Sequence, residues 1–140
     1  MESKQKDNLI FIRLFPDENI YEKLEEACKK YNINSAVVIS GIGQLKDFKL
    51  GYFKEKGNYR PEHFKTSHEL LSLGGSICAQ KGEYKFHLHA VLGNEKKEVV
   101  GGHLIEGFVE VTNEIVLLQT DLKIARRLEK DTGLEGMFLE

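Results

Sequence analysis

The sequence holds few cysteines and no long hydrophobic segment, and both absences exclude whole classes of protein. Its 140 residues include two cysteines, Cys28 and Cys78, each within an apolar segment. We therefore expect two small core residues in a reducing compartment, and not a disulfide framework. No apolar run approaches the ~20 residues that a membrane-spanning helix requires, so we expect no membrane partner.

The chain also lacks a strong charge of either sign. Its formal net charge is −2, which gives no long-range attraction to nucleic acid or to an anionic membrane. The first eight residues, MESKQKDN, contain no apolar region of the kind found in secretory signals, so we expect a cytoplasmic protein. No repeat, low-complexity segment or linker divides the chain. We therefore expect one domain over residues 9–140, preceded by a flexible N-terminal tail at 1–8.

One segment has the periodicity of an amphipathic helix. From Ile20 to Tyr31, apolar residues recur at helical spacing, and charged residues fill the remaining positions. Asp17 or Asn19 can cap its first turn by accepting hydrogen bonds from backbone N–H groups. The charged face needs no functional explanation, because it is the face that solvent covers.

The rest of the chain alternates apolar and polar residues, which indicates about seven short strands. One helix and many strands predict an α+β fold with a largely antiparallel sheet. The polar segment 54–67 is expected to cross the surface, with His63 and His68 exposed. Sheet edges must be covered or paired, which favours a homo-oligomer. The expected strands cover 9–14, 35–40, 44–53, 69–79, a hairpin at 84–108, and 108–118, while 122–131 is part strand and part turn.

Two glycines interrupt the second expected strand. Gly41 and Gly43 form a Gly-x-Gly pattern, but no third glycine opens a helix after them, as a phosphate-binding loop would require. The residues that follow alternate like a strand instead. We therefore interpret both glycines as structural, at a bulge or a close backbone approach.

The hairpin over 84–108 carries the strongest chemical signal. His87 and His89 are two residues apart on its first strand, so both side chains leave the same face of the sheet. A hairpin symmetric about Lys96 places His89 opposite His103, and His87 opposite Ile105. Directly opposed residues share a face, with Cβ atoms roughly 4.5–5.5 Å apart. Three imidazoles are therefore predicted to converge on one patch.

Such a patch can bind a divalent transition metal. Zinc accepts three histidine nitrogens at roughly 2.0–2.1 Å and leaves a fourth position open, and we expect zinc first. Nickel, copper and iron accept the same donors, so the spacing does not name the metal. The alternative is that these histidines simply lie on the solvent side of a sheet. A register slip of one residue would send His103 to the other face.

Several stretches together resemble the PPC (plants and prokaryotes conserved) domain, in its stand-alone prokaryotic form. They follow in order and at compatible spacings over nearly the whole chain. The matching stretches are 38–43 (VISGIG), 51–53 (GYF), 69–77 (ELLSLGGSI), 87–90 (HLHA), 101–104 (GGHL) and 131–134 (DTGL).

The resemblance implies a compact α+β domain assembled as a homotrimer, and it brings the family label of candidate DNA-binding protein. The plant relatives carry AT-hooks, whose Arg-Gly-Arg-Pro core enters the A·T minor groove, but this chain has no such core. Of the plant motif Gly-Arg-Phe-Glu-Ile-Leu it keeps the Glu and the apolar end but not Gly-Arg-Phe, since residues 66–71 read TSHELL.

Three functions remain open on the sequence. The first is a PPC-type regulatory module, associated with DNA or a partner, that holds a metal at His87, His89 and His103. The second is a metal-dependent hydrolase or lyase, for which Glu69, Glu106 or Glu110 could supply a general base. The third is a trimer that senses a small molecule at the same site.

Overall fold

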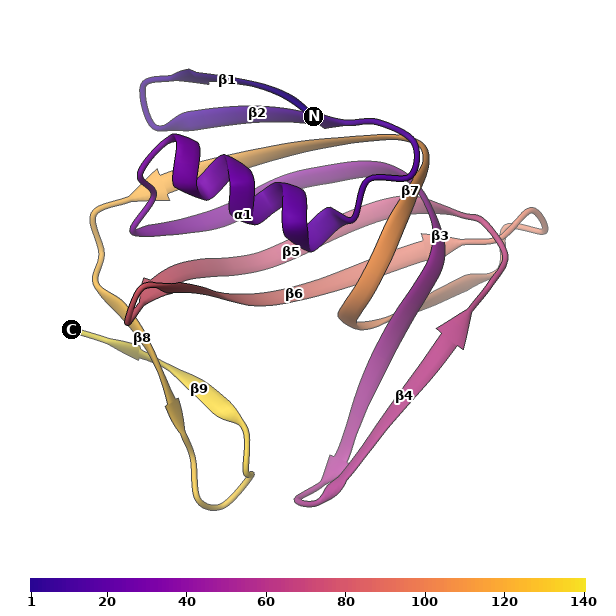
Figure 1. Ribbon diagram of the computed structural model, residues 1–140. Coiled ribbons are helices and arrows are strands. Elements are labelled where there is room, and N and C mark those ends of the chain that lie inside the picture. The colour runs from indigo at the N-terminus through magenta and orange to yellow at the C-terminus, as the bar shows by residue number, and fades with distance from the viewer.

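Alternating apolar residues fold most of the chain into one antiparallel sheet of seven strands, in a computed structural model that describes residues 1–140 (Figure 1). The β3 strand also pairs with β7, so β3, β5, β6 and β7 form a closed circuit of paired strands. In sheet order the strands are β1 (Glu2–Lys6), β2 (Leu9–Leu14), β7 (Val99–Thr120), β6 (Glu83–Gly93), β5 (His68–Gln80), β3 (Ser35–Glu55) and β4 (Asn58–Phe64).

The helix α1 (Ile20–Lys30) covers one face of this sheet (Figure 1). Asn19 is its N-cap, since its side chain accepts hydrogen bonds from the N–H groups of Tyr21 and Glu22, as predicted. The buried side of α1 joins a core cluster of 23 residues drawn mostly from Ile, Leu and Val. With 11 residues, α1 is too short to span a membrane, and it is the one helix of the structure.

The two longest strands, β3 and β7, bend through bulges. The pairing of β3 with β7 shifts register at four points, one of them between Gly43 and Leu45. Gly43 has φ +147°, and a Cβ there would lie 2.0 Å from the carbonyl oxygen of Thr112. The structural interpretation of Gly43 is therefore confirmed. Bulges also explain why 35–40 and 44–53, expected as two strands, form the single strand β3.

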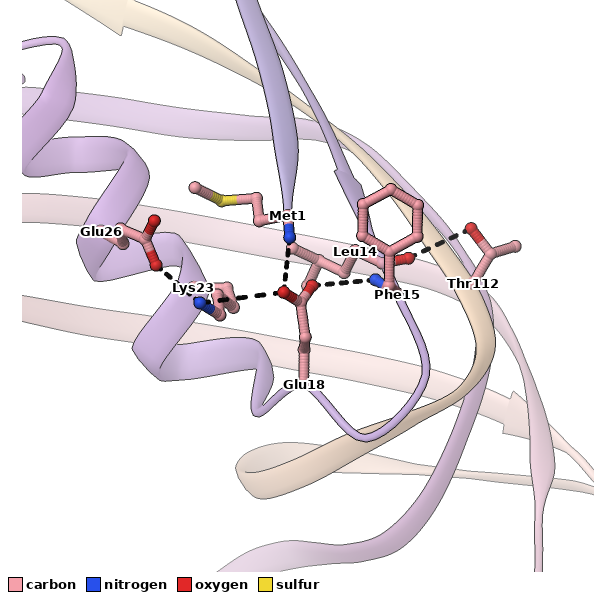
Figure 2. Close-up of polar contacts among 7 residues, drawn as sticks. All are labelled: Met1, Leu14, Phe15, Glu18, Lys23, Glu26 and Thr112. Atoms are coloured by element: carbon pink, nitrogen blue, oxygen red, sulfur yellow. Dashed lines mark hydrogen bonds and ion pairs between the residues drawn. The ribbon is translucent and has the colours of Figure 1, made fainter.

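Residues 1–8 do not form the expected flexible tail. Glu2–Lys6 is the edge strand β1, paired with β2 in register. The ammonium group of Met1 lies 2.5 Å from Oε1 of Glu18, whose other oxygen accepts the N–H of Phe15 (Figure 2). The sequence did not predict β1 because both faces of this strand are largely exposed, so its residues show no apolar alternation.

The polar segment 54–67 was expected to cross the surface without regular structure, but it contains a strand. Asn58–Phe64 forms β4 and pairs with the end of β3, where the ring of Phe64 stacks on Phe48 at 4.9 Å. His68 is only 6% exposed, because it packs edge-on against these two rings. The prediction that His68 is exposed was wrong, whereas His63 lies on the surface.

The C-terminal residues form a second, two-stranded sheet of β8 (Ile124–Leu128) and β9 (Glu135–Leu139). The side chain of Gln80 in β5 hydrogen-bonds the backbone N–H and carbonyl of Arg126 in β8. At the other end of this hairpin, Lys56 of the β3–β4 turn donates to the carbonyl of Lys130. The turns of the β3–β4 and β8–β9 hairpins both point away from β1 and β2 (Figure 1).

Candidate metal centre

The β6–β7 hairpin brings the three predicted histidines together. His89 pairs directly with His103, so the predicted register is confirmed at this pair. The second predicted pair, His87 with Ile105, does not form. Pairing of β6 with β7 stops at His103, because β7 there crosses to β3 and pairs with Gly51.

The imidazole rings face one another closely enough to share an ion. One nitrogen from each of the three residues lies within 4.8 Å of the others. Nε2 of His87 is 3.2 Å from Nε2 of His89, and the ring centroids are 5.1 to 5.4 Å apart. Three nitrogens at such separations suit a tetrahedral ion with one position left for another ligand. The donor set thus fits zinc or a similar divalent metal.

Pairing of β6 with β5 fixes the position of His87. Gly75 pairs with Leu88 and has φ +141°, and a Cβ there would lie 1.9 Å from the carbonyl oxygen of His87. Only glycine allows the two backbones to approach so closely at this point. Leu88 is fully buried on the α1 side, so His87 and His89 lie on the opposite, outer face.

The surroundings of His87 and His103 favour the neutral, metal-binding form of these two side chains. Burial is the main cause that lowers the pKa of His87, with Arg126 and His89 adding to it. Burial likewise lowers the pKa of His103, with His87 and His89 as further causes. Because the pKa is lowered, a larger fraction of each of these imidazoles is neutral near neutral pH. Such imidazoles are ready to donate a lone pair to a metal.

The triad forms part of the wall of a pocket of about 860 Å³. Residues of the β3–β4 hairpin line one side, including Tyr59, whose ring packs edge-on to His103 at 6.2 Å. Residues of the β8–β9 hairpin, including Arg126 and Glu135, line the other side. Arg126 was not among the predicted site residues, because nothing in the sequence indicates that β8 folds back against β5.

The three glutamates considered as general bases lie elsewhere. Glu69 accepts a hydrogen bond from Gln44, while Glu106 pairs with Lys49 and Glu110 with Lys46. None of them lines the pocket of the triad, where Glu135 is the one carboxylate. Cys28 and Cys78 are buried free thiols, and burial raises the pKa of Cys28 to about 12, which makes it a poor nucleophile.

Comparison with known proteins finds a curated relative that is described as bifunctional. The chain is 28% identical over 132 residues to the bifunctional protein GlmU of a Synechococcus strain. The match covers 92% of this chain but 20% of GlmU, so this chain spans about a fifth of the length of that curated relative.

Three solved structures share the fold over nearly their full length. A plant- and prokaryote-conserved (PPC) protein of Pyrococcus horikoshii is 34% identical, with a TM-score of 0.81 over 96% of this chain and 93% of that one. A candidate DNA-binding protein of Bacteroides thetaiotaomicron is 25% identical, with a TM-score of 0.91 over 98% and 96%. A metal-containing protein of Archaeoglobus fulgidus is 25% identical, with a TM-score of 0.84 over the same shares.

The match to a family model agrees with these structures and with the resemblance to the PPC domain noted in the sequence. The family model of the Plants and Prokaryotes Conserved (PCC) domain, called PPC above, matches residues 1–121. That range contains the seven-stranded sheet, the helix and all three histidines of the triad. It follows from the sequence match and the fold together that this chain belongs to the PCC domain family.

Proposed function

We propose that this protein is a regulatory module that binds a divalent transition metal, with zinc as the first choice, through His87, His89 and His103. The observation that carries the proposal is the approach of one nitrogen from each histidine to within 4.8 Å of the others. When bound, such a metal polarises a ligand or a water at its open position. Support also comes from the A. fulgidus relative, which is described as metal-containing.

Binding is favoured over turnover by the position of the acidic residues. A metal hydrolase needs a carboxylate that takes a proton beside the metal. Glu106 and Glu110 pair with lysines, and Glu69 accepts a hydrogen bond from Gln44. Glu135 is the one carboxylate that lines the triad's pocket, and it comes from the β8–β9 hairpin with no hydrogen bond or ion pair to a histidine of the triad. The metal-dependent enzyme considered from the sequence therefore ranks below a binding module.

Direct contact with DNA is also less favoured than the metal. The label of candidate DNA-binding protein belongs to relatives such as the B. thetaiotaomicron protein. In this chain Lys46 lies 2.7 Å from Asp17 and 3.1 Å from Glu110, and Lys49 lies 2.9 Å from Glu106. Their charges are thus offset, and the net charge of −2 adds no attraction to phosphates. We propose that the regulatory role runs through a bound ligand or protein partner, in the cytoplasm.

A homotrimer is the second part of the proposal, and an apolar surface supports it. The outer face of the sheet exposes Phe11, Val37, Ile39 and Leu118, of which Phe11 and Ile39 are more than half exposed. Val37 pairs with Leu118, and Phe11 pairs with Val116, so these side chains lie side by side across β2, β7 and β3. A continuous apolar face of this kind is typical of a surface that another protein chain covers.

The metal proposal is tested by elemental mass spectrometry on untagged protein loaded with zinc and then freed of excess metal. We expect about one zinc per chain in the wild type and in the control His63→Ala, which removes an exposed histidine outside the triad. The double variant His87→Ala/His89→Ala should retain none. Equal zinc in the double variant and the control, or no zinc in any protein, would refute the site.

A further inference from the structure

Arg126 presents a fixed guanidinium group at the wall of the histidine pocket. The residue is 6% exposed, and Gln80 holds its backbone through two hydrogen bonds of 2.6 and 3.0 Å. Its Nη2 donates to Oγ of Ser76 at 2.6 Å, and its Nη1 lies 3.5 Å from Nδ1 of His87. A buried side chain held at both ends does not swing away to solvent.

This guanidinium has no counter-ion within the chain. Arg126 takes part in none of the ion pairs of the structure. Its Nε is buried and has no hydrogen-bond partner. Glu135 lines the same pocket, but its carboxylate does not pair with Arg126. Buried charges in proteins are normally paired, because an isolated one loses its hydration without compensation.

Metal binding would leave a second hydrogen-bond donor without an acceptor, in addition to that of Arg126. This second donor is on His87. Its Nε2 faces Nε2 of His89, and we assign these atoms to the metal. A neutral imidazole that binds metal through Nε2 carries its proton on Nδ1, and that N–H usually donates to a carboxylate or a carbonyl. In this protein Nδ1 faces Nη1 of Arg126, which can only donate. Two donors thus converge on a point that holds no acceptor.

We propose that the pocket takes a small molecule with a carboxylate or phosphate group, whose oxygens accept hydrogen bonds from Arg126 and from Nδ1–H of His87. The proposal rests on the metal site proposed above. Such an oxyanion supplies both the missing acceptor and the missing counter-charge, and a metal beside Arg126 increases the need for it. The volume of about 860 Å³ admits a small organic acid or phosphate ester.

The test titrates zinc-loaded and metal-free protein with inorganic phosphate and, separately, with malonate, using chloride at matched ionic strength as the reference. Thermal unfolding and calorimetry then report binding without any assay of activity. We expect saturable stabilisation of the wild type. In Arg126→Gln the affinity should fall by about tenfold or more, since a charged hydrogen bond is lost.

Arg127→Gln is the matched control, because Arg127 is the next residue, is exposed, and pairs with Glu140. It should bind the anions as the wild type does. If Arg126→Gln does not fold, Arg126→Lys retains the charge but loses the planar fork, and it should bind more weakly than the control. The stronger of the two probes identifies the group as phosphate or carboxylate.

The outcomes separate this inference from the metal proposal. Zinc retention with no anion effect beyond that of chloride overturns the inference and leaves the metal site intact. Equal anion binding by Arg126→Gln and Arg127→Gln also overturns it. Anion binding that depends on Arg126 in a protein that retains no zinc supports the anion site, while the metal proposal fails.

Discussion

At the residue scale, the chemistry of this protein depends on three imidazoles that lie close together, two of them exposed and His103 half-buried. His87 and His103 both have a pKa below the ordinary value of 6.5, and burial is the main cause for each. Protonation of either ring places a positive charge beside its neighbours and, for His87, beside Arg126. The same features that keep the rings neutral also make the site sensitive to acid.

We predict that metal-free protein loses stability as the pH falls below neutral. The unfolded chain binds protons at these positions more readily than the folded chain, because the folded-state pKa is the lower one. The stability linked to the two histidines is complete above pH 6.5 and is lost as the pH falls through 6.5 toward the lower folded-state pKa values.

Urea unfolding of the metal-free wild type and of His103→Gln, measured over the same series of pH values, checks this prediction. The glutamine variant should show a shallower decline, because one of the two titrating groups is gone. A decline of equal steepness in both proteins would show that other groups cause the loss.

At the element scale, the site depends on how closely β5 approaches β6. Gly74 and Gly75 are adjacent in β5, yet their surroundings differ sharply. A Cβ on Gly75 meets the backbone of His87, whereas a Cβ on Gly74 meets nothing within 4 Å. Gly75 also has a positive φ that side-chain-bearing residues rarely adopt.

We predict that Gly75→Ala destabilises the protein by at least about 1–3 kcal/mol, through backbone strain and displacement of the strand that carries His87. It should also weaken zinc binding, because His87 shifts relative to His103. Gly74→Ala is the control and should have little effect on either property. Urea unfolding and zinc titration of both variants give the comparison, and equal behaviour of the two would contradict this account of the strand contact.

At the scale of the whole molecule, one face of the sheet is covered by α1 and the opposite face is not. The uncovered face carries the apolar residues Phe11, Val37, Ile39 and Leu118. Ser76 pairs with both Val37 and His87, so the histidines lie on this same face. Assembly through this face would bring a neighbouring chain near the metal pocket.

We predict that the protein elutes as three copies of its 16.0 kDa chain, measured by size-exclusion chromatography with light scattering. Ile39→Glu places a charge on the apolar face and should yield monomer, because a buried charge without a partner opposes association. Lys29→Glu changes the charge on α1, on the opposite side, and should leave the assembly intact. A monomeric wild type would refute the trimer, and an unchanged Ile39→Glu assembly would place the interface elsewhere.

The sequence by itself determined the elements whose patterns are local. The period of α1, the alternation of β6 and β7 and the polar turn between them predicted the helix and the facing of His89 to His103. These features follow from neighbours in the chain, because side-chain direction is fixed by residue number once the element type is known.

Only the tertiary structure decided the features that depend on segments far apart in the chain. β1 and β4 are edge strands with little apolar alternation, so the local sequence does not predict them. Their strand structure depends on pairing with β2 and β3. His68 is buried because Phe48 and Phe64 close over it. Arg126 reaches the pocket because β8 folds onto β5, where it meets Gln80, a residue 46 positions earlier in the chain. No local pattern encodes such contacts, since their energy comes from packing and pairing between distant segments.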